Sequence, residues 1–224
     1  MIVNAETAPL HNLGMTSNRT RERLVARLGR HGIHRADVLA AIKDTPRHWF
    51  VDEALAGRAY EDTALPLGFG QTISQPYVVA LMTQALLDHG ATGKILEIGT
   101  GCGYQTSVLA RCVKHIVSVE RLRGLLVRAR AVLKRQHIAN VLTVHGDGFH
   151  GWPAEGPYDG IMVTAAPKQL PNALLQQLSA TGVLVLPVGP AGNQKLVRIC
   201  RDGEGFHSVD LGAVSFVPLV KGVR

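Results

Sequence analysis

Short apolar runs alternate with amphipathic segments from Lys94 to the end of this 224-residue chain. The apolar runs are of strand length and predict strands at 94–98, 115–120, 141–145, 158–164 and 183–188. The segments between them predict helices at 104–113, 122–136 and 169–178. Two later runs, 195–201 and 206–217, have no helix between them and predict an antiparallel finish. Repeated strand–helix–strand units impose parallel strands, so we expect an α/β sheet that binds its ligand beyond the carboxyl ends of the strands.

The first third of the chain has a different pattern. Apolar side chains at helical spacing predict helices over 19–30 and 37–43, and another that begins at Pro76 and is ended by Gly90. The intervening segment 49–73 carries proline and glycine and predicts an irregular loop. We therefore divide the chain into a disordered extension (1–15), a helical cap with a substrate loop (16–90), and one core (91–224).

Three glycines at alternate positions, Gly99, Gly101 and Gly103, follow the first of these strands and precede a helix. Glycine suits this place because the turn requires unusual dihedrals and because a ligand must approach bare backbone. A dinucleotide does not fit, since its fingerprint requires glycine at the position of Tyr104 and the Glu97 carboxylate would repel a pyrophosphate. S-adenosylmethionine (SAM) carries an ammonium and a sulfonium, so it is the cofactor that this turn favours.

Acidic residues follow the next two strands. Glu120 ends its strand about 20 residues after Glu97, where α/β cofactor folds place a ribose-binding acid. One carboxylate can accept hydrogen bonds from both ribose hydroxyls. A second interpretation makes Glu120 the partner of Arg121 or Arg123 at the start of the helix. Asp147 lies between two glycines and is either an acceptor for the adenine amino group or only an Asx-turn residue.

A polar segment precedes the helix that begins at Pro76. Its hydroxyl residues, Thr72 and Ser74, are unsuited to a core and are predicted to fold over the cofactor site. Pro76 suits the first helical position, which makes Gln75 the N-cap, while the alternative that Ser74 is the cap stays open. No histidine and acid accompany Ser74 at a recognisable spacing, so a nucleophilic serine is not expected. The ten histidines show no ligand pattern, and we expect no metal.

Composition narrows the class of protein. The net charge of +7 can attract nucleic acid, but the basic residues are spread over predicted helix faces and form no tail. Aromatic residues make up 5%, too few for stacking platforms on single strands. Three widely spaced cysteines suit a reducing compartment, and no apolar run approaches the ~20 residues of a membrane span. We expect a cytoplasmic protein, favoured as a monomer, with neither nucleic acid nor membrane as partner.

Four segments carry a resemblance to a known family: 68–77 (GFGQTISQPY), 96–106 (LEIGTGCGYQT), 117–121 (VSVER) and 216–220 (FVPLV). Together they resemble the protein-L-isoaspartate (D-aspartate) O-methyltransferase family, from about Thr16 to the C-terminus. The second segment alone indicates only a SAM-dependent methyltransferase, whereas the first is far more selective. The resemblance implies a Rossmann-like, mostly parallel seven-stranded sheet with antiparallel C-terminal strands and an N-terminal helical subdomain.

The resemblance also implies a function and its residues. The enzyme would repair damaged proteins and peptides by transferring a methyl group from SAM to the free α-carboxylate of L-isoaspartyl residues; activity on D-aspartyl residues stays open. Ser74 falls on the family's catalytic serine. Substrate binding is expected at Thr72, Ile73, Gln75, Val217, Pro218 and Leu219. Cofactor binding is expected at Glu97, Gly99, Thr100, Gly101, Gly103, Glu120, Arg121, Asp147, Gly148 and Thr164.

Two positions depart from the family's pattern, and two other functions stay open. Cys102 stands where serine is common, and Ser215 where many bacterial relatives carry a basic residue. One alternative is a SAM-dependent methyltransferase acting on nucleic acid or another carboxylate, although the chain lacks the Asn/Asp-Pro-Pro-Tyr/Phe segment of amino-directed enzymes. The other is a non-catalytic protein that keeps the pocket, which the intact acids and Ser74 oppose.

Overall fold

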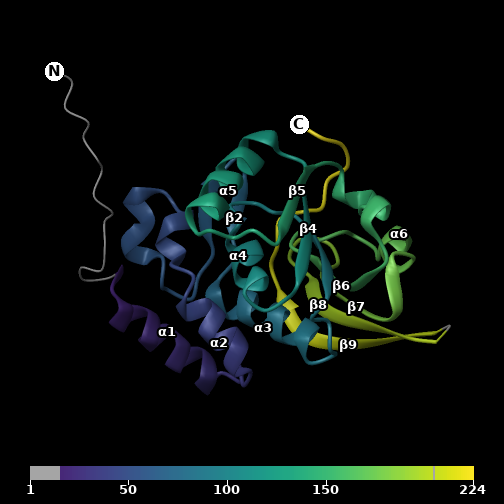
Figure 1. Cartoon of the computed structure of the whole chain (residues 1–224), viewed down its shortest axis with the longest axis horizontal. Coiled ribbons are helices and arrows are strands. Elements are labelled where there is room, and N and C mark those ends of the chain that lie inside the picture. Colours follow the sequence, from purple (N-terminus) through teal and green to yellow (C-terminus); the bar gives the residue numbers. More distant parts are fainter. Residues whose placement is uncertain (1–15, 204) are drawn as a thin grey trace.

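The computed structural model describes residues 16–203 and 205–224, and the extension predicted over residues 1–15 lies outside them. The described residues form one large sheet flanked by helices, with α1 and α2 forming a cap on one side and α6 lying far from that cap (Figure 1). None of the helices described here has the length and apolar content needed to cross a membrane.

The elements alternate as the pattern predicts. The helices are α1 (Asn18–Arg30), α2 (Ala36–Lys43), α3 (Pro76–Leu87), α4 (Tyr104–Ala110), α5 (Arg123–Arg135) and α6 (Asn172–Leu175). The strands are β1 (Leu65–Gly68), β2 (Gln71–Ile73), β3 (Lys94–Ile98), β4 (His115–Glu120), β5 (Val141–His145), β6 (Tyr158–Val163), β7 (Leu178–Val188), β8 (Gln194–Asp202) and β9 (Gly205–Val214). Short 3₁₀ turns cover Arg47–Phe50, Glu53–Arg58, Gly148–His150 and Pro153–Glu155.

The large sheet has the strand order β5-β4-β3-β6-β7-β8-β9. Strands β5, β4, β3, β6 and β7 run parallel, and β8 and β9 complete the sheet antiparallel. The predicted fold class, a mostly parallel seven-stranded sheet with antiparallel C-terminal strands, is confirmed. The chain reverses its direction of winding at β3, which has β4 on one side and β6 on the other. Such a switch point opens a crevice beyond the carboxyl ends of the strands.

Both faces of the sheet are buried, which explains why its central strands are nearly continuous apolar runs. Within β3, Ile95 packs into one core, and Leu96 and Ile98 pack into the other. The first core extends into the cap through Leu24 and Leu28 of α1. The cap therefore shares its hydrophobic core with one face of the sheet.

The prediction of an irregular loop over 49–73 is wrong in part, because the second half of this segment forms the antiparallel β1–β2 hairpin. Leu65, Leu67 and Ile73 are buried and hold the hairpin against the body of the protein. The prediction missed it because the strands are only four and three residues long and carry Pro66 and glycine, residues that demote a run to a loop.

Other boundaries also differ from the prediction: the helix predicted over 104–113 ends at Ala110, and the strand predicted over 183–188 begins at Leu178. The helix predicted over 169–178 is shorter in the structure, where α6 covers Asn172–Leu175, because Leu178 pairs with Tyr158 and already belongs to β7. The last strand ends at Val214 instead of Val217. Beyond it, the Gln194 side chain takes over the ladder hydrogen bonds: its Oε1 accepts from the Phe216 amide at 2.6 Å, and its Nε2 donates to the Phe216 carbonyl at 3.0 Å.

Gly160 in β6 provides a test of this packing. An added Cβ would lie 2.8 Å from Ile95 Cδ1 and 3.0 Å from Ala91 Cβ. Gly160→Ala should therefore lower the free energy of unfolding by about 1–3 kcal/mol, measured by urea denaturation. Gly29→Ala in α1 is the matched control, since nothing lies within 4 Å of its added Cβ. Equal stability of the two variants would contradict the packing described here.

Candidate functional site

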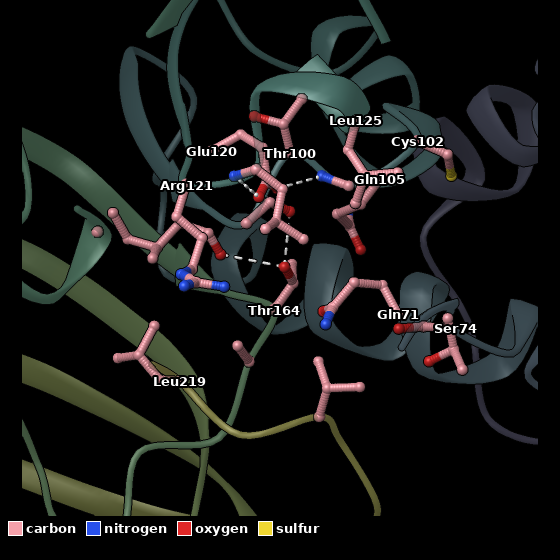
Figure 2. A pocket seen from close by; sticks show the side chains of 18 of the residues that line it. Gln71, Ser74, Thr100, Cys102, Gln105, Glu120, Arg121, Leu125, Thr164 and Leu219 are labelled. Carbon is pink, nitrogen blue, oxygen red and sulfur yellow. Dashed lines mark hydrogen bonds between the residues drawn. The ribbon is translucent and has the colours of Figure 1, made fainter. Parts of the chain in front are cut away.

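A cavity of about 120 Å³ opens at the carboxyl ends of β3 and β4. Its walls come from four segments that are distant in sequence, 71–74, 98–102, 119–122 and 217–220, and from Thr164 just beyond β6 (Figure 2). The cavity thus lies at the switch point of the sheet, where open α/β sheets bind ligands.

The glycine turn follows the conformation that its sequence predicts. Gly99, Gly101 and Gly103 have φ angles of 97°, 55° and 86°, in the left-handed region that favours glycine. A Cβ on Gly99 would lie 2.3 Å from the Thr164 hydroxyl oxygen, whereas nothing lies within 4 Å of an added Cβ on Gly101. The Thr164 hydroxyl lies 2.7 Å from the Gly99 carbonyl and joins β6 to the turn. The turn therefore presents bare backbone to the cavity.

The Glu120 carboxylate holds this turn in place. Its Oε2 accepts a hydrogen bond from the Gly101 amide at 2.8 Å, and its Oε1 accepts one from the Leu122 amide at 2.9 Å. Within the described residues it forms no ion pair with Arg121, whose Nε instead donates to the Gly222 carbonyl at 3.0 Å. Each carboxylate oxygen has a second lone pair, so Glu120 can still accept hydrogen bonds from a ligand.

Glu97 lies behind the cavity and is fully buried. Its Oε2 accepts hydrogen bonds from the hydroxyls of Thr106 at 2.6 Å and Ser118 at 2.5 Å, while its Oε1 has no partner. Burial raises the pKa of Glu97 to about 7, although both hydroxyls oppose this shift. The Ser118 hydroxyl also lies 2.6 Å from the hydroxyl of Thr100, which lines the cavity. Glu97 thus reaches the cavity only through other side chains.

Asp147 uses its carboxylate for two backbone contacts. Its Oδ1 accepts from the Phe149 amide at 2.9 Å, which makes it the cap of the turn Gly148–His150. Its Oδ2 accepts from the Gly222 amide at 2.7 Å and so holds the last residues of the chain near the cavity. Burial opposes ionisation of Asp147, but the two amides, together with charge interactions with His150 and Arg121, outweigh it and hold its pKa below the ordinary value. Its neighbour Gly148 lines the cavity.

The hairpin brings the predicted hydroxyls to the cavity. Thr72, Ile73 and Ser74 all line it. Gln75 is the N-cap residue of α3 and Pro76 takes the first helical position, so the alternative that Ser74 is the cap is wrong. Neither hydroxyl forms a hydrogen bond with another described residue, so both are available to a ligand.

A second, larger cavity of about 610 Å³ adjoins the first. The two share Thr72, Ser74, Thr164 and Val217. Gln75 lines only the second cavity, and the run 213–217 forms its other wall. Two adjoining cavities that meet at hydroxyl side chains are suited to bringing two reactants together.

The structure brings together most of the predicted site residues, but not all. The cavity wall includes Thr72, Ile73, Ser74, Gly99, Thr100, Gly101, Glu120, Arg121, Gly148, Thr164, Val217, Pro218 and Leu219. Glu97, Gly103 and Asp147 stand behind it. The sequence interpretation missed Gln71, Tyr104 and Gln105, which also line the cavity. Tyr104 and Gln105 follow Gly103 directly, so their place at the helix start was the available signal. No group of acids, histidines and cysteines in the described residues has the arrangement of a metal site.

A mostly parallel sheet with a glycine turn and a strand-end acid around one cavity defines an α/β methyltransferase fold. A solved β-aspartate methyltransferase (PCMT) from Plasmodium falciparum, in complex with S-adenosyl-L-homocysteine, has this fold with a TM-score of 0.79 at 26% identity. That comparison covers 90% of this chain and 98% of the solved chain.

Sequence comparison is more specific. The family model for protein-L-isoaspartate(D-aspartate) O-methyltransferase matches residues 18–224. The protein-L-isoaspartate O-methyltransferase of Halorhodospira halophila is 53% identical over 210 residues, 94% of this chain and 96% of that relative. Protein-L-isoaspartate O-methyltransferase 1 of Marinobacter nauticus is 55% identical over 217 residues, 97% of this chain and 99% of that relative. The chain belongs to the protein-L-isoaspartate (D-aspartate) O-methyltransferase family, and the resemblance seen in its motifs is confirmed.

The raised pKa of Glu97 predicts a dependence of stability on pH. An unfolded glutamate titrates near ~4.3, so between that value and about 7 the folded protein binds the extra proton. The stabilising contribution is therefore complete below the unfolded pKa and is lost as the pH rises through about 7. Glu97→Gln keeps an oxygen acceptor but does not titrate. From about pH 5 to about pH 8, wild type should lose about 1–3 kcal/mol of unfolding free energy relative to this variant in urea denaturation. A difference that stays constant with pH would contradict this assignment.

Proposed function

We propose that this protein transfers the methyl group of SAM to the free α-carboxylate of L-isoaspartyl residues in damaged proteins and peptides. Membership of the family supports the enzyme class and the cofactor. The observation that supports the two-substrate reaction is the meeting of two cavities at Thr72, Ser74, Thr164 and Val217.

The residues around the smaller cavity fit SAM. Glu120 has lone pairs left for the ribose hydroxyls, Gly101 offers bare backbone, and the buried Tyr104 hydroxyl has no hydrogen-bond partner. We assign direct contact to the predicted cofactor residues on the wall: Gly99, Thr100, Gly101, Glu120, Arg121, Gly148 and Thr164. Glu97, Gly103 and Asp147 would act indirectly, by holding that wall. Glu97 would hold Thr100 through the Ser118 hydroxyl, Gly103 would hold the glycine turn, and Asp147 would hold the end of the chain.

Bound SAM supplies a methyl group on a positively charged sulfur. The α-carboxylate of an isoaspartyl residue has a pKa near ~3.5 and is already an anion at neutral pH, so it attacks without a general base. The task left to the protein is positioning, which can contribute several kcal/mol. Ser74 would donate a hydrogen bond to the carboxylate as the catalytic residue, with Thr72 beside it.

The peptide would lie in the larger cavity. Gln75 and Val217 line it, Ile73 lies between the two hydroxyl residues, and Pro218 and Leu219 continue the wall into the smaller cavity. The methyl ester formed cyclises to a succinimide that opens in part to normal aspartate, which makes the reaction one of repair. The three free cysteines suit a cytoplasmic protein, and we propose that it is a monomer.

The function is tested with SAM labelled on its methyl group and two peptides that differ only in isoaspartate or aspartate at one position. Base-labile label should appear on the isoaspartyl peptide alone, because only its free α-carboxylate fits beside Ser74. Equal labelling of both peptides would indicate a broader carboxyl methyltransferase. Absence of label from both, with SAM bound, would overturn the proposal and make nucleic acid the next substrate to test.

Ser74→Ala tests the catalytic role. Loss of a hydrogen bond to a charged group should lower kcat/KM for the isoaspartyl peptide roughly ten- to hundredfold. The dissociation constant for SAM, measured by calorimetry, should stay unchanged. Ser208→Ala on the exposed strand β9 is the matched control and should behave as wild type. If Ser74→Ala weakens SAM binding as much as turnover, Ser74 serves the cofactor and not the carboxylate.

A further inference from the structure

The tip of the β1–β2 hairpin has an unusual backbone. Gly68, Phe69 and Gly70 have φ angles of 81°, 55° and 68°. A positive φ is ordinary for glycine but uncommon for a bulky residue, and it persists only where surrounding contacts hold it. Phe69 is nevertheless 58% exposed, so few contacts surround it. The contacts that it does make are therefore the ones that must hold the tip.

Those contacts lie on α5. The Phe69 ring rests on Gly124 in the first turn of that helix, so closely that a Cβ on Gly124 would lie 3.0 Å from the ring's Cζ. One turn further on, the Arg128 guanidinium carbon lies 5.5 Å from the ring centroid, within the range of a cation–π interaction. Gly124 and Arg128, four residues apart on one helix face, form a seat for the ring. The seat holds a phenylalanine side chain only because residue 124 has none.

The contact joins two segments whose neighbouring residues line the cofactor cavity. The hairpin is a separate two-stranded sheet, and a two-stranded hairpin is at best marginally stable by itself. Its second strand and the residues after it, 71–74, wall the cavity on one side. Leu122 and Leu125, which flank Gly124, wall it on another. Docking of Phe69 on Gly124 therefore ties together two segments of the cavity wall.

We propose that Phe69 is a positioning residue, whose docking on Gly124 and Arg128 latches the hairpin over the cofactor cavity and sets Thr72 and Ser74 against it. The proposal rests on the role assigned above to Ser74. The docked state is held by a partly exposed contact and opposed by the strained backbone of the tip, so little free energy separates it from the released state. Release lets the tip of the hairpin move away from α5, while Leu65, Leu67 and Ile73 stay buried, and opens the cavity for exchange of the spent cofactor, S-adenosylhomocysteine.

Two substitutions remove the contact from opposite sides. Phe69→Ala removes the ring, and Gly124→Val fills the seat while leaving the sequence of the hairpin unchanged. Each should weaken S-adenosylhomocysteine binding roughly threefold or more, as loss of a cation–π contact predicts, and should speed its dissociation in stopped-flow measurements. Each should also raise KM for the isoaspartyl peptide more than it lowers kcat. The double variant should be no worse than either single variant, because both remove one contact.

The controls separate a latch from general destabilisation. Val127→Ala removes an equally exposed apolar side chain from α5, and Gly29→Val adds the same side chain to α1, where nothing lies within 4 Å. Both should bind S-adenosylhomocysteine as wild type does. Phe69→Tyr keeps the ring face and should restore binding and KM. The unfolding temperatures of Gly124→Val and Gly29→Val are compared, since both replace a helical glycine, and the loss of S-adenosylhomocysteine affinity in Gly124→Val should persist at temperatures where both variants are fully folded.

The outcomes decide the proposal independently of the methyl acceptor. Normal S-adenosylhomocysteine affinity and dissociation in Phe69→Ala would overturn it, as would a Gly124→Val variant that behaves as wild type. Additive effects in the double variant would also overturn it, because the two residues would then act separately. If wild type labels no isoaspartyl peptide, the proposed function fails. The affinity for S-adenosylhomocysteine and its dissociation rate still test the latch in that case.

Discussion

The Glu120 carboxylate is the point on which the site depends. It accepts hydrogen bonds from the amides of Gly101 and Leu122, so one side chain fixes the glycine turn after β3 and the start of α5 after β4. A carboxylate with two charge-assisted hydrogen bonds is a strong and directional clamp. Because β3 and β4 are neighbours in the sheet, the clamp also sets the floor of the cavity between them.

The cap is joined to that floor by a buried cation. Arg47 is fully buried, donates to the carbonyls of Ala59 at 2.8 Å and Thr63 at 3.0 Å, and lies 5.4 Å from the ring centroid of Tyr104. Burial lowers the pKa of Arg47. Tyr104 lines the smaller cavity and Thr63 lines the larger one. The guanidinium therefore links the two proposed substrate sites to the 3₁₀ turn Arg47–Phe50 of the cap.

The chemistry requires little of the protein beyond holding the site residues in place. An acceptor that is already an anion removes the need for a base, which agrees with a site whose polar groups are mainly hydroxyls and backbone amides. What must be controlled is the entry of water and the separation of two reactants. The hairpin and the end of the chain held by Asp147 border the cavity and are the elements placed to exercise that control.

The sequence by itself determined the succession of strands and helices along the chain. The alternating runs, the three glycines and Glu120 are local patterns, and each imposes local geometry wherever it occurs. It predicted the parallel sheet for the same reason. Only the tertiary structure decided that Glu97 lies behind the cavity while Thr100, in the turn after the same strand, lines it, because these side-chain directions depend on how the turn packs against the neighbouring strands. It also decided the hairpin and the seat of Phe69 on Gly124. Phe69 and Gly124 are 55 positions apart, and no local pattern of hydrophobic residues encodes such a contact. The strands of the hairpin are close in sequence, but they are too short to show a strand pattern.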